Sequence, residues 1–206
     1  PHQPVLASDV AHNRLIVSAR VLQPPGLDAG YDTATTYGSF GALIGHELSR
    51  AIDNRGQLVD AKGDVRNWWT PADLAAWENV SVKVATQYNA YPYPAATGTN
   101  VNGFLTKDEN TADLAAVELA WDALNAVQPT LSPAEREAFF KGWALLWREQ
   151  TSPETAAFNA TTSVHAPGQW RTNGPLANQP AFAEVFKCKL GTGMVRKAED
   201  QISIWR

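Results

Sequence analysis

The order of hydrophobic and polar positions along this chain predicts mostly helices, with extended structure near the N-terminus. Residues 14–22 are rich in β-branched and apolar side chains, which favours a strand, and the prolines and glycine at 24–26 end it. Residues 38 to about 52 are predicted to form a helix, which the asparagine and glycine in 54–56 would break. The chain is therefore expected to begin with a small sheet and to continue as a helical protein.

Two further helices begin at capping signals. Thr70 precedes Pro71 and has Asp73 three positions later, which predicts a helix from there to about residue 90. A Ser-Pro-Ala-Glu capping box at 132–135 predicts another helix that continues to about residue 149. Between these two lies a predicted helix from near residue 107 to about residue 127.

Beyond residue 150, prolines and glycines are frequent. This part is therefore predicted to be rich in loops, with one short helix at 180–187. A length of 206 residues fits one domain, and we expect residues 1–206 to form one. The predicted fold class is mainly α (α+β), helical with a small N-terminal antiparallel sheet.

Composition and charge exclude several classes of protein. A hydrophobic fraction of 44% and 8 tryptophans indicate a folded globular chain rather than a disordered one. The net charge of −4 argues against nucleic acid as a partner. No stretch of the sequence is long and apolar enough to span a membrane. The single cysteine, Cys188, excludes an intrachain disulfide.

The segment from His46 to Arg50 reads His-Glu-Leu-Ser-Arg, which is a zinc-binding motif with one ligand missing. In the complete motif, His-Glu-x-x-His, residues four apart share one helix face, so two imidazoles hold the metal while the glutamate activates water. Arg50 stands where the second imidazole is required. Because arginine stays protonated and offers only donors, it cannot ligate a cation.

Carboxylates that suit such a site follow later in the sequence. Glu109 lies near the start of the predicted helix 107–127, and Asp113 lies one turn later on the same face. This spacing suits a further metal ligand and a carboxylate that orients a ligating imidazole. Asp53 lies three residues after Arg50 and is expected to face it.

Motifs along nearly the whole chain resemble the C-terminal catalytic domain of the neprilysin and endothelin-converting-enzyme family of zinc metallopeptidases, especially its bacterial members. They occur in the family's order and at its spacing, and include Asn-Trp-Trp-Thr-Pro at 67–71 and His-Ala-Pro-Gly-Gln-Trp-Arg at 165–171. The others are at 22–25, 44–47, 101–103, 109–113, 142–144, 173–176 and 204–205. The resemblance implies a thermolysin-like (gluzincin) fold and hydrolysis of peptide bonds by zinc-activated water.

The resemblance also implies roles for individual residues at the metal. His46 matches the first zinc ligand, Glu109 matches the third ligand, and Glu47 matches the general base that takes a proton from zinc-bound water. Asp113 matches the carboxylate behind the first histidine ligand. Asp53 matches the carboxylate behind the second, whose place Arg50 has taken.

Other matched residues concern the substrate. His165 matches the residue that stabilises the tetrahedral oxyanion, and Arg171 matches the residue that binds a substrate carbonyl near the cleaved bond. The family builds an apolar S1′ pocket at positions that correspond here to Leu43, Leu146 and Trp147. The resemblance therefore implies a peptide substrate or peptide ligand as the partner.

Four departures from the family pattern concern the site or the strand that binds substrate. Arg50 replaces the second zinc ligand. Residues 5–6, or 6–7 with a shift of one, stand where the family has an Asn-Ala pair that holds the substrate as an added strand. Ser163 replaces an aspartate, and Asp108 replaces a glycine before the glutamate ligand. Because most scaffold motifs remain, this distribution is what a pseudoenzyme would leave.

Zinc is the cofactor that the resemblance implies, but we expect it to bind weakly in this chain. His46 and Glu109 leave the site one ligand short, and Arg50 adds a repelling positive charge. We hypothesise that the Arg50 guanidinium instead bridges Glu109 and one of Glu47 or Asp53. The arginine would then fill the electrostatic place of the metal.

Three functional hypotheses follow. The first is a catalytically impaired pseudopeptidase that binds peptide, pairs with another chain or acts structurally. The second is an active zinc metalloendopeptidase with an atypical metal site, which water, Asp53 or a partner chain completes. The third is that Arg50 is an engineered change in a normal enzyme, and the other three departures argue against it.

The resemblance has two further implications. The family's N-terminal helical portion, which caps the active-site chamber, has no counterpart in this sequence. We therefore expect a C-terminal fragment, a split gene product or a stand-alone degenerate copy, with another chain as the source of the N-terminal portion. An exported, periplasmic or extracellular location is what the resemblance favours.

Overall fold

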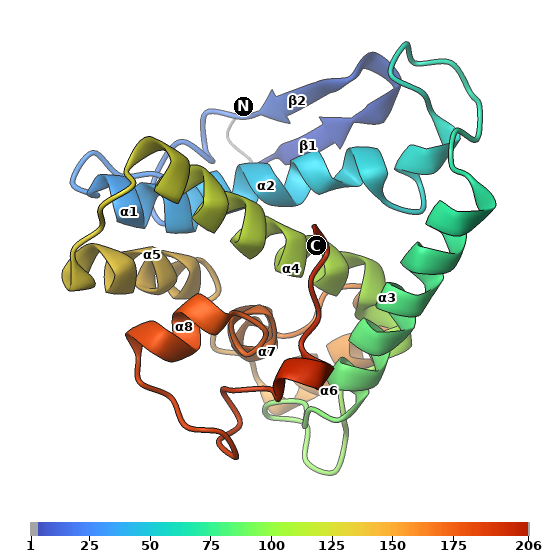
Figure 1. Ribbon diagram of the computed structural model, residues 1–206. Coiled ribbons are helices and arrows are strands. Elements are labelled where there is room, and N and C mark those ends of the chain that lie inside the picture. The colour runs from blue at the N-terminus through green and yellow to red at the C-terminus, as the bar shows by residue number, and fades with distance from the viewer. Residues whose placement is uncertain (1–3, 206) are drawn as a thin grey trace.

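The computed structural model describes residues 4–205, and helices make up most of it (Figure 1). The two ends of the domain predicted over 1–206 lie outside the described residues. Strands β1 (Leu6–Asp9) and β2 (Arg14–Val17) form an antiparallel hairpin. The mainly helical fold with a small N-terminal sheet is therefore confirmed. The helices are α1 (Thr33–Thr36), α2 (Ala42–Ser49), α3 (Pro71–Asn89), α4 (Gly103–Val127), α5 (Pro133–Leu146), α6 (Pro153–Thr162), α7 (Gly168–Leu176) and α8 (Pro180–Val185).

The strand predicted at 14–22 is too long. Its partner β1 begins only at Leu6, so the ladder ends with a hydrogen bond from Ser18 N to Val5 O at 2.8 Å. Beyond this point the chain turns, and Val21 N donates to Ser18 O at 3.1 Å. The short strand β1 carries no pattern that predicts it from sequence alone.

The helix predicted at 38–52 is one part of a longer helical segment whose pitch changes. Asp32 caps its start by accepting a hydrogen bond from Thr35 N at 2.6 Å. A π-helical turn at Tyr37–Gly41 joins α1 to α2, and a 3-10 turn at Arg50–Ile52 ends the segment. Regular α-helical geometry is therefore limited to α1 and to α2, which carries His46 and Glu47, whereas Arg50 begins the 3-10 turn.

The capping box predicted at 132–135 is present, and the capping signal predicted at 70–73 also forms one. Thr70 and Asp73 satisfy one another's backbone donors at the start of α3, and Ser132 and Glu135 do so at the start of α5. Two helix ends differ from the prediction. α4 begins four residues early because the side chain of Asn102 accepts a hydrogen bond from Leu105 N at 3.0 Å, and α5 stops at 146 rather than 149.

The loop-rich prediction beyond residue 150 is wrong for α6 and α7. α6 begins with the same kind of signal as the earlier helices, because Ser152 caps it and Pro153 is its first residue. Pro167 precedes α7, and Pro175 lies in its last turn. Prolines at helix starts were thus misinterpreted as loop residues, although a proline at the first position fits a helix well.

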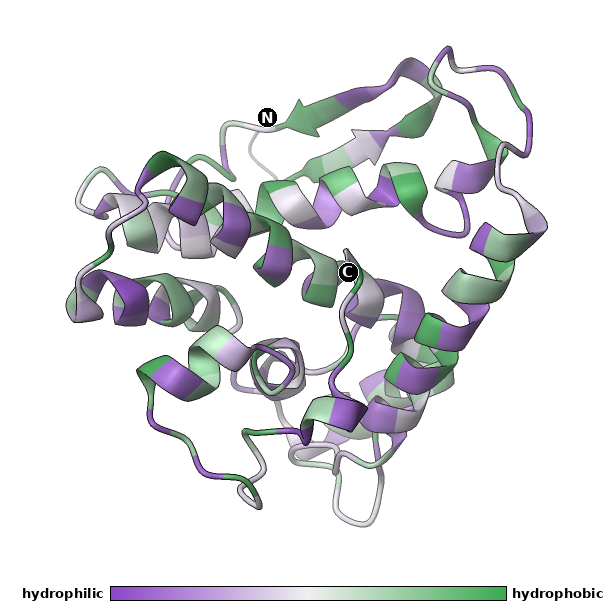
Figure 2. Cartoon of the chain, in the orientation of Figure 1, coloured by the Kyte–Doolittle hydropathy of each residue, from purple (hydrophilic) through white to green (hydrophobic). Residues whose placement is uncertain are grey.

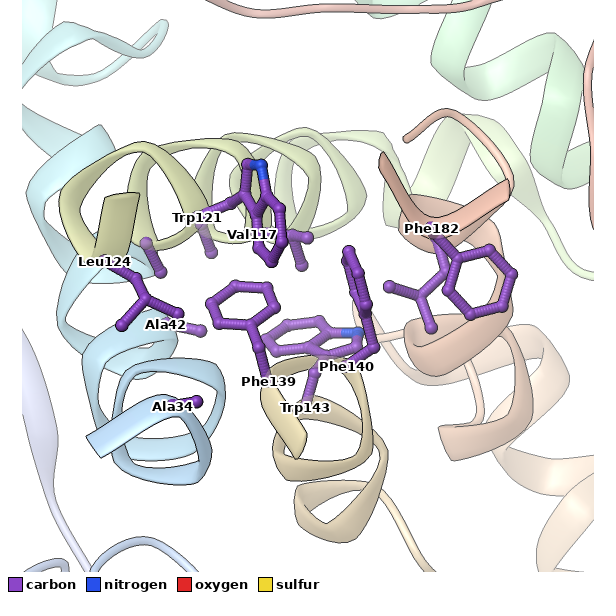
Figure 3. Packing of buried hydrophobic residues seen from close by; sticks show 12 residues of the cluster. Ala34, Ala42, Val117, Trp121, Leu124, Phe139, Phe140, Trp143 and Phe182 are labelled. Carbon is purple, nitrogen blue, oxygen red and sulfur yellow. The ribbon is translucent and has the colours of Figure 1, made fainter. Parts of the chain in front are cut away.

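α4 is the central helix, and α2, α3 and α7 all pack against it (Figure 1). On another side, aromatic rings join it to α5. Trp121 of α4 stacks on Phe140 and meets Phe139 edge-on, beside the fully buried Trp143 (Figure 3). This cluster fixes α5 against α4, and the end of α5 in turn carries Leu146 toward the site.

The hairpin lies over α2, on the side opposite α4 (Figure 1). Figure 2 shows hydrophobic residues at the end of β2, where Ile16 and Val17 are 44% and 38% exposed. The end of this strand therefore stays open to solvent. Within residues 4–205, no helix has both the length and the apolar character needed to cross a membrane.

Gly45 allows α2 to cross closely over α4. A Cβ atom at this position would lie 3.2 Å from the carbonyl oxygen of Ala116, which is tighter than ordinary van der Waals contact. The neighbouring residue is His46, so the close crossing brings its imidazole to the polar face of α4. Glycine at 45 therefore helps to determine the geometry of the site.

A second close approach joins the π-helical turn to α5 and gives a test of the packing. A Cβ atom on Gly38 would overlap the backbone carbonyl of Phe139, whereas one on Gly193 would meet nothing within 4 Å. We expect Gly38→Ala to lower the free energy of unfolding by about 2 kcal/mol or more. Urea unfolding should show no comparable loss in the control variant Gly193→Ala. Equal stability of the two variants would contradict this packing.

Candidate functional site

The site lies where α2 crosses α4. His46, on α2, is 7% exposed, and Asp113, on α4, is fully buried. The two are joined by a contact of 2.8 Å between His46 Nδ1 and Asp113 Oδ1. The structure therefore places the predicted orienting carboxylate directly behind the imidazole, so that the other ring nitrogen, Nε2, faces the open side of the site.

Arg50, one turn after His46, occupies that open side. Its Nη2 atom lies 2.5 Å from Glu109 Oε2 and 3.0 Å from His46 Nε2, and its Nη1 atom lies 3.4 Å from Asp53 Oδ2. A guanidinium has donors only, so His46 Nε2 accepts from it. Of the two bridges that the sequence suggests for Arg50, the one observed joins Glu109 and Asp53.

Three side chains come close to one oxygen of Glu109. His46 Nε2 lies 3.3 Å from Glu109 Oε2, and His165 Nε2 lies 3.2 Å from the same oxygen. Burial alone would raise the pKa of the Glu109 carboxyl. The neighbouring imidazoles of His165 and His46 and the charge of Arg50 outweigh burial and hold that pKa far below its ordinary value. Glu109 is therefore ionised at neutral pH.

A second guanidinium holds Asp113 from the other side. Arg171, on α7, donates to both of its carboxylate oxygens, from Nε at 2.8 Å and from Nη2 at 2.7 Å. Burial raises the pKa of Asp113, but the charge and hydrogen bonds of Arg171 outweigh it and lower the pKa below its usual range. Arg171 also lies over the ring of Trp147, with its Cζ atom 3.6 Å from the ring centroid.

Glu47, the residue after His46, points toward the hairpin. Its Oε2 atom accepts a hydrogen bond from the backbone N–H of Ser8 on β1, at 2.8 Å. Sequence reasoning missed this contact, because a backbone donor from a distant strand leaves no mark in the sequence. The contact ties the hairpin to α2 and occupies one oxygen of the predicted general base.

Leu43, Leu146 and Trp147, which the family resemblance assigns to an apolar substrate pocket, line one pocket. Its volume is about 440 Å³. Leu43 comes from α2, and the other two residues come from the end of α5. The aromatic cluster that fixes α5 against α4 therefore also positions this wall of the pocket. Its remaining lining includes Leu6, Val21, Pro24 and Pro25.

The other departures from the family pattern also make local hydrogen bonds, although the buried Oδ1 atom of Asp108 has no partner among the described residues. Ser163 Oγ donates to His165 O at 2.9 Å and accepts from His165 N at 3.1 Å, which closes the loop that carries this histidine. Asp108 accepts a hydrogen bond from Asn54 Nδ2 at 3.2 Å. Val5 pairs with Ser18 next to the hairpin ladder.

The donor set does not fit a zinc ion in its usual coordination. A protein zinc site needs at least three ligands, and His46 Nε2 and Glu109 Oε2 are the only matched pair here, both already in contact with Arg50 Nη2. Across residues 4–205, no group of three or more histidine, cysteine, aspartate or glutamate side chains is arranged to hold a metal. A cation in this position would also meet the positive charge of Arg50.

Comparison with known proteins gives one consistent result. The family model described as peptidase family M13 matches residues 9–202. Endothelin-converting enzyme 1 of Rattus norvegicus is 31% identical over 191 residues, which cover 88% of this chain and 25% of that protein. The chain therefore spans about a quarter of the length of the curated relatives it matches.

Solved structures give the same result. The crystal structure of PepO from Lactobacillus rhamnosis HN001 superposes with a TM-score of 0.88 at 35% identity, over 98% of this chain and 31% of that one. The Mycobacterium tuberculosis zinc metalloprotease Zmp1 in its open state gives a TM-score of 0.89 at 27% identity, over 98% of this chain and 33% of that one.

The burial of Arg50 predicts its contribution to stability. Arg50→Met leaves Glu109 and Asp53 without their shared cation, and we expect a loss of about 3 kcal/mol in the free energy of unfolding at neutral pH. Arg14 pairs with Asp9 at an exposed position, so Arg14→Met should cost less than about 1 kcal/mol. Chemical denaturation with a chelator present would measure both, and equal losses would contradict the structure.

The lowered pKa values of Glu109 and Asp113 predict the effect of acid. Both groups are more acidic in the folded chain than their ordinary values of 4.5 and 3.8, so the unfolded state takes up protons first as the pH falls. Their stabilisation is complete above about pH 5 and is lost progressively below it. Glu109→Gln should therefore lose less stability than the unmodified chain between about pH 5 and about pH 3. Identical acid dependence of the two proteins would show that Glu109 is not held in this way.

Proposed function

This chain belongs to peptidase family M13, the neprilysin family of zinc metallopeptidases, and we propose that it is a pseudopeptidase, which binds peptides without hydrolysing them through zinc. The observation that carries the proposal is the position of Arg50. Its Nη2 atom contacts both His46 Nε2 and Glu109 Oε2, the two atoms that the family resemblance assigns to the metal.

The electrostatics of the site support the proposal. Glu109 and Asp53 are the carboxylates that a cation at this place would neutralise, and Arg50 already pairs with both. A zinc ion about 4 Å from the guanidinium would be repelled by about 8 kcal/mol at an effective dielectric constant of 20. Binding of zinc would thus require Arg50 to leave two partly buried carboxylates, in addition to replacing the missing ligand.

The apolar pocket keeps the residues that the resemblance assigns to it, although the Asn-Ala pair expected in the neighbouring strand is absent. The apolar pocket has room for one side chain, and Trp147, in its wall, is held by the stacked Arg171. The hairpin lies beside it, tied to α2 through Ser8 and Glu47. These features support a role in which the chain recognises an apolar side chain of a peptide.

An active zinc peptidase with an atypical ligand set is the second candidate, and one observation favours it. His165 Nε2 lies 3.2 Å from Glu109 Oε2, so a second imidazole is in contact with the carboxylate that the resemblance assigns to the metal. In this alternative His46, Glu109 and His165 would form the donor set after Arg50 had moved away. The side chain of His165 is 48% exposed, which leaves it free to move.

Zinc binding by variants at position 50 separates the two candidates. We expect the unmodified chain to bind zinc weakly and Arg50→His to bind about one zinc ion per chain, at least roughly a thousandfold more tightly. Arg50→Ala is the matched control, because it removes the repelling charge without adding a ligand. It should fall between the other two in equilibrium dialysis against zinc. Adding Glu109→Ala to Arg50→His should abolish the gain if the ion lies in this site.

Hydrolysis of a quenched fluorescent peptide by the same proteins completes the test. The proposal predicts no turnover that depends on Glu47 in the unmodified chain, as judged by comparison with Glu47→Gln. Stoichiometric zinc together with Glu47-dependent turnover in the unmodified chain would overturn the pseudopeptidase proposal. Loss of that zinc in His165→Ala would then identify the atypical ligand set.

A further inference from the structure

Two arginines without an ion-pair partner lie beside the apolar pocket. Arg20 lines the pocket itself, together with Leu43 and Trp147. Arg148 lines an adjoining hollow of about 610 Å³, which shares Pro24, Pro25 and Leu146 with the pocket. Both side chains are exposed, and neither forms an ion pair with any described residue. The pocket and the adjoining hollow thus each contain one arginine, and the two hollows share part of their wall.

Local contacts keep these charges at the pocket. Arg20 Nη1 donates to the side-chain oxygen of Gln23 at 3.2 Å, and Gln23 lines the same pocket. Arg148 follows directly after Trp147, at the end of α5, so the buried helix fixes where its side chain begins. Glu149 is the carboxylate in the lining of the adjoining hollow, but its Oε1 accepts from Gly168 N at 2.7 Å.

We propose that Arg20 and Arg148 make the pocket selective for acidic peptides, in which an apolar side chain is flanked by aspartate or glutamate. The inference rests on the proposed peptide-binding function and names the class of peptide. An apolar side chain enters between Leu43, Leu146 and Trp147, and the carboxylates on either side of it pair with the two guanidinium groups. Charge complementarity sets the preference, and burial of the apolar side chain supplies most of the affinity.

The overall charge of the chain does not favour acidic peptides, so a preference for them depends on local cations. The net charge is −4, so an acidic peptide is repelled by the molecule as a whole and needs local cations in order to bind. Exposed ion pairs are weak, so each arginine is expected to favour the acidic peptide by about fivefold or less. The preference should shrink in high salt, because the pairs are open to solvent.

The test compares two labelled peptides on the full chain by fluorescence anisotropy. One peptide has the sequence Ala-Glu-Glu-Leu-Glu-Glu-Ala, and the other has glutamine in place of every glutamate. We expect the unmodified chain to bind the acidic peptide roughly tenfold more tightly at about 0.02 M salt and to lose most of the difference at about 0.5 M. The double variant Arg20→Gln, Arg148→Gln should bind the two peptides with equal affinity at both salt concentrations.

Two controls complete the design. Arg55 is also exposed and forms no ion pair within residues 4–205. It lines neither hollow, so Arg55→Gln should keep the preference. Leu146→Asp should weaken binding of both peptides, because it places a charge in the apolar wall. Equal binding of the two peptides by the unmodified chain would overturn the proposed role of the arginines but would leave peptide binding itself intact. Failure to bind either peptide would overturn peptide binding itself, and with it this inference.

Discussion

Arg50 Nη2 lies 2.5 Å from Glu109 Oε2 at the crossing of α2 and α4, and the geometry of the whole site depends on this ion pair. It joins the two helices that carry the zinc-type residues, and it does so with a charge of the sign that a metal would supply. Without a cation at this place, Glu109 and Asp53 would repel one another across a partly buried space. The Arg50 side chain therefore supplies the positive charge that holds these two carboxylates close together.

The residues that the family resemblance assigns to a metal make other contacts in this chain. Asp113 lies behind His46, where it would orient a ligating imidazole, but in this chain the other ring nitrogen of His46 accepts from Arg50. Arg171 pairs with Asp113 on its other side and stacks on Trp147, so one buried carboxylate links the metal-type residues to the apolar pocket. The charged residues around His46 and the wall of the apolar pocket are thus joined by direct contacts.

Local sequence signals predicted the parts of the fold that depend on neighbours in the chain. The capping signals at Thr70 and Ser132 predict two helix starts correctly. Ser152 carries the same kind of signal, but the prolines around it favour a loop prediction there. The four-residue spacing predicts that Arg50 and His46 share one helix face. The spacing of Glu109 and Asp113 predicts that these two share a face of α4, and this face meets α2.

Contacts between distant segments could not be predicted in this way. The hydrogen bond from Ser8 N to Glu47 depends on how the hairpin lies over α2, and the stacking of Arg171 on Trp147 depends on how α7 meets the end of α5. The placement of Arg20 and Arg148 beside one apolar wall likewise needs the turn after β2 and the end of α5 to meet. Sequence can indicate such residues only through a family resemblance, which names positions and not contacts.

The central claim is that Arg50 occupies the electrostatic place of zinc. The most direct measurement is anomalous diffraction at the zinc absorption edge, from crystals of this protein grown with zinc present. The account predicts no anomalous peak between His46 and Glu109 and clear density for the Arg50 guanidinium in contact with both. A zinc peak within about 2.1 Å of His46 Nε2 and Glu109, with Arg50 turned away, would contradict it.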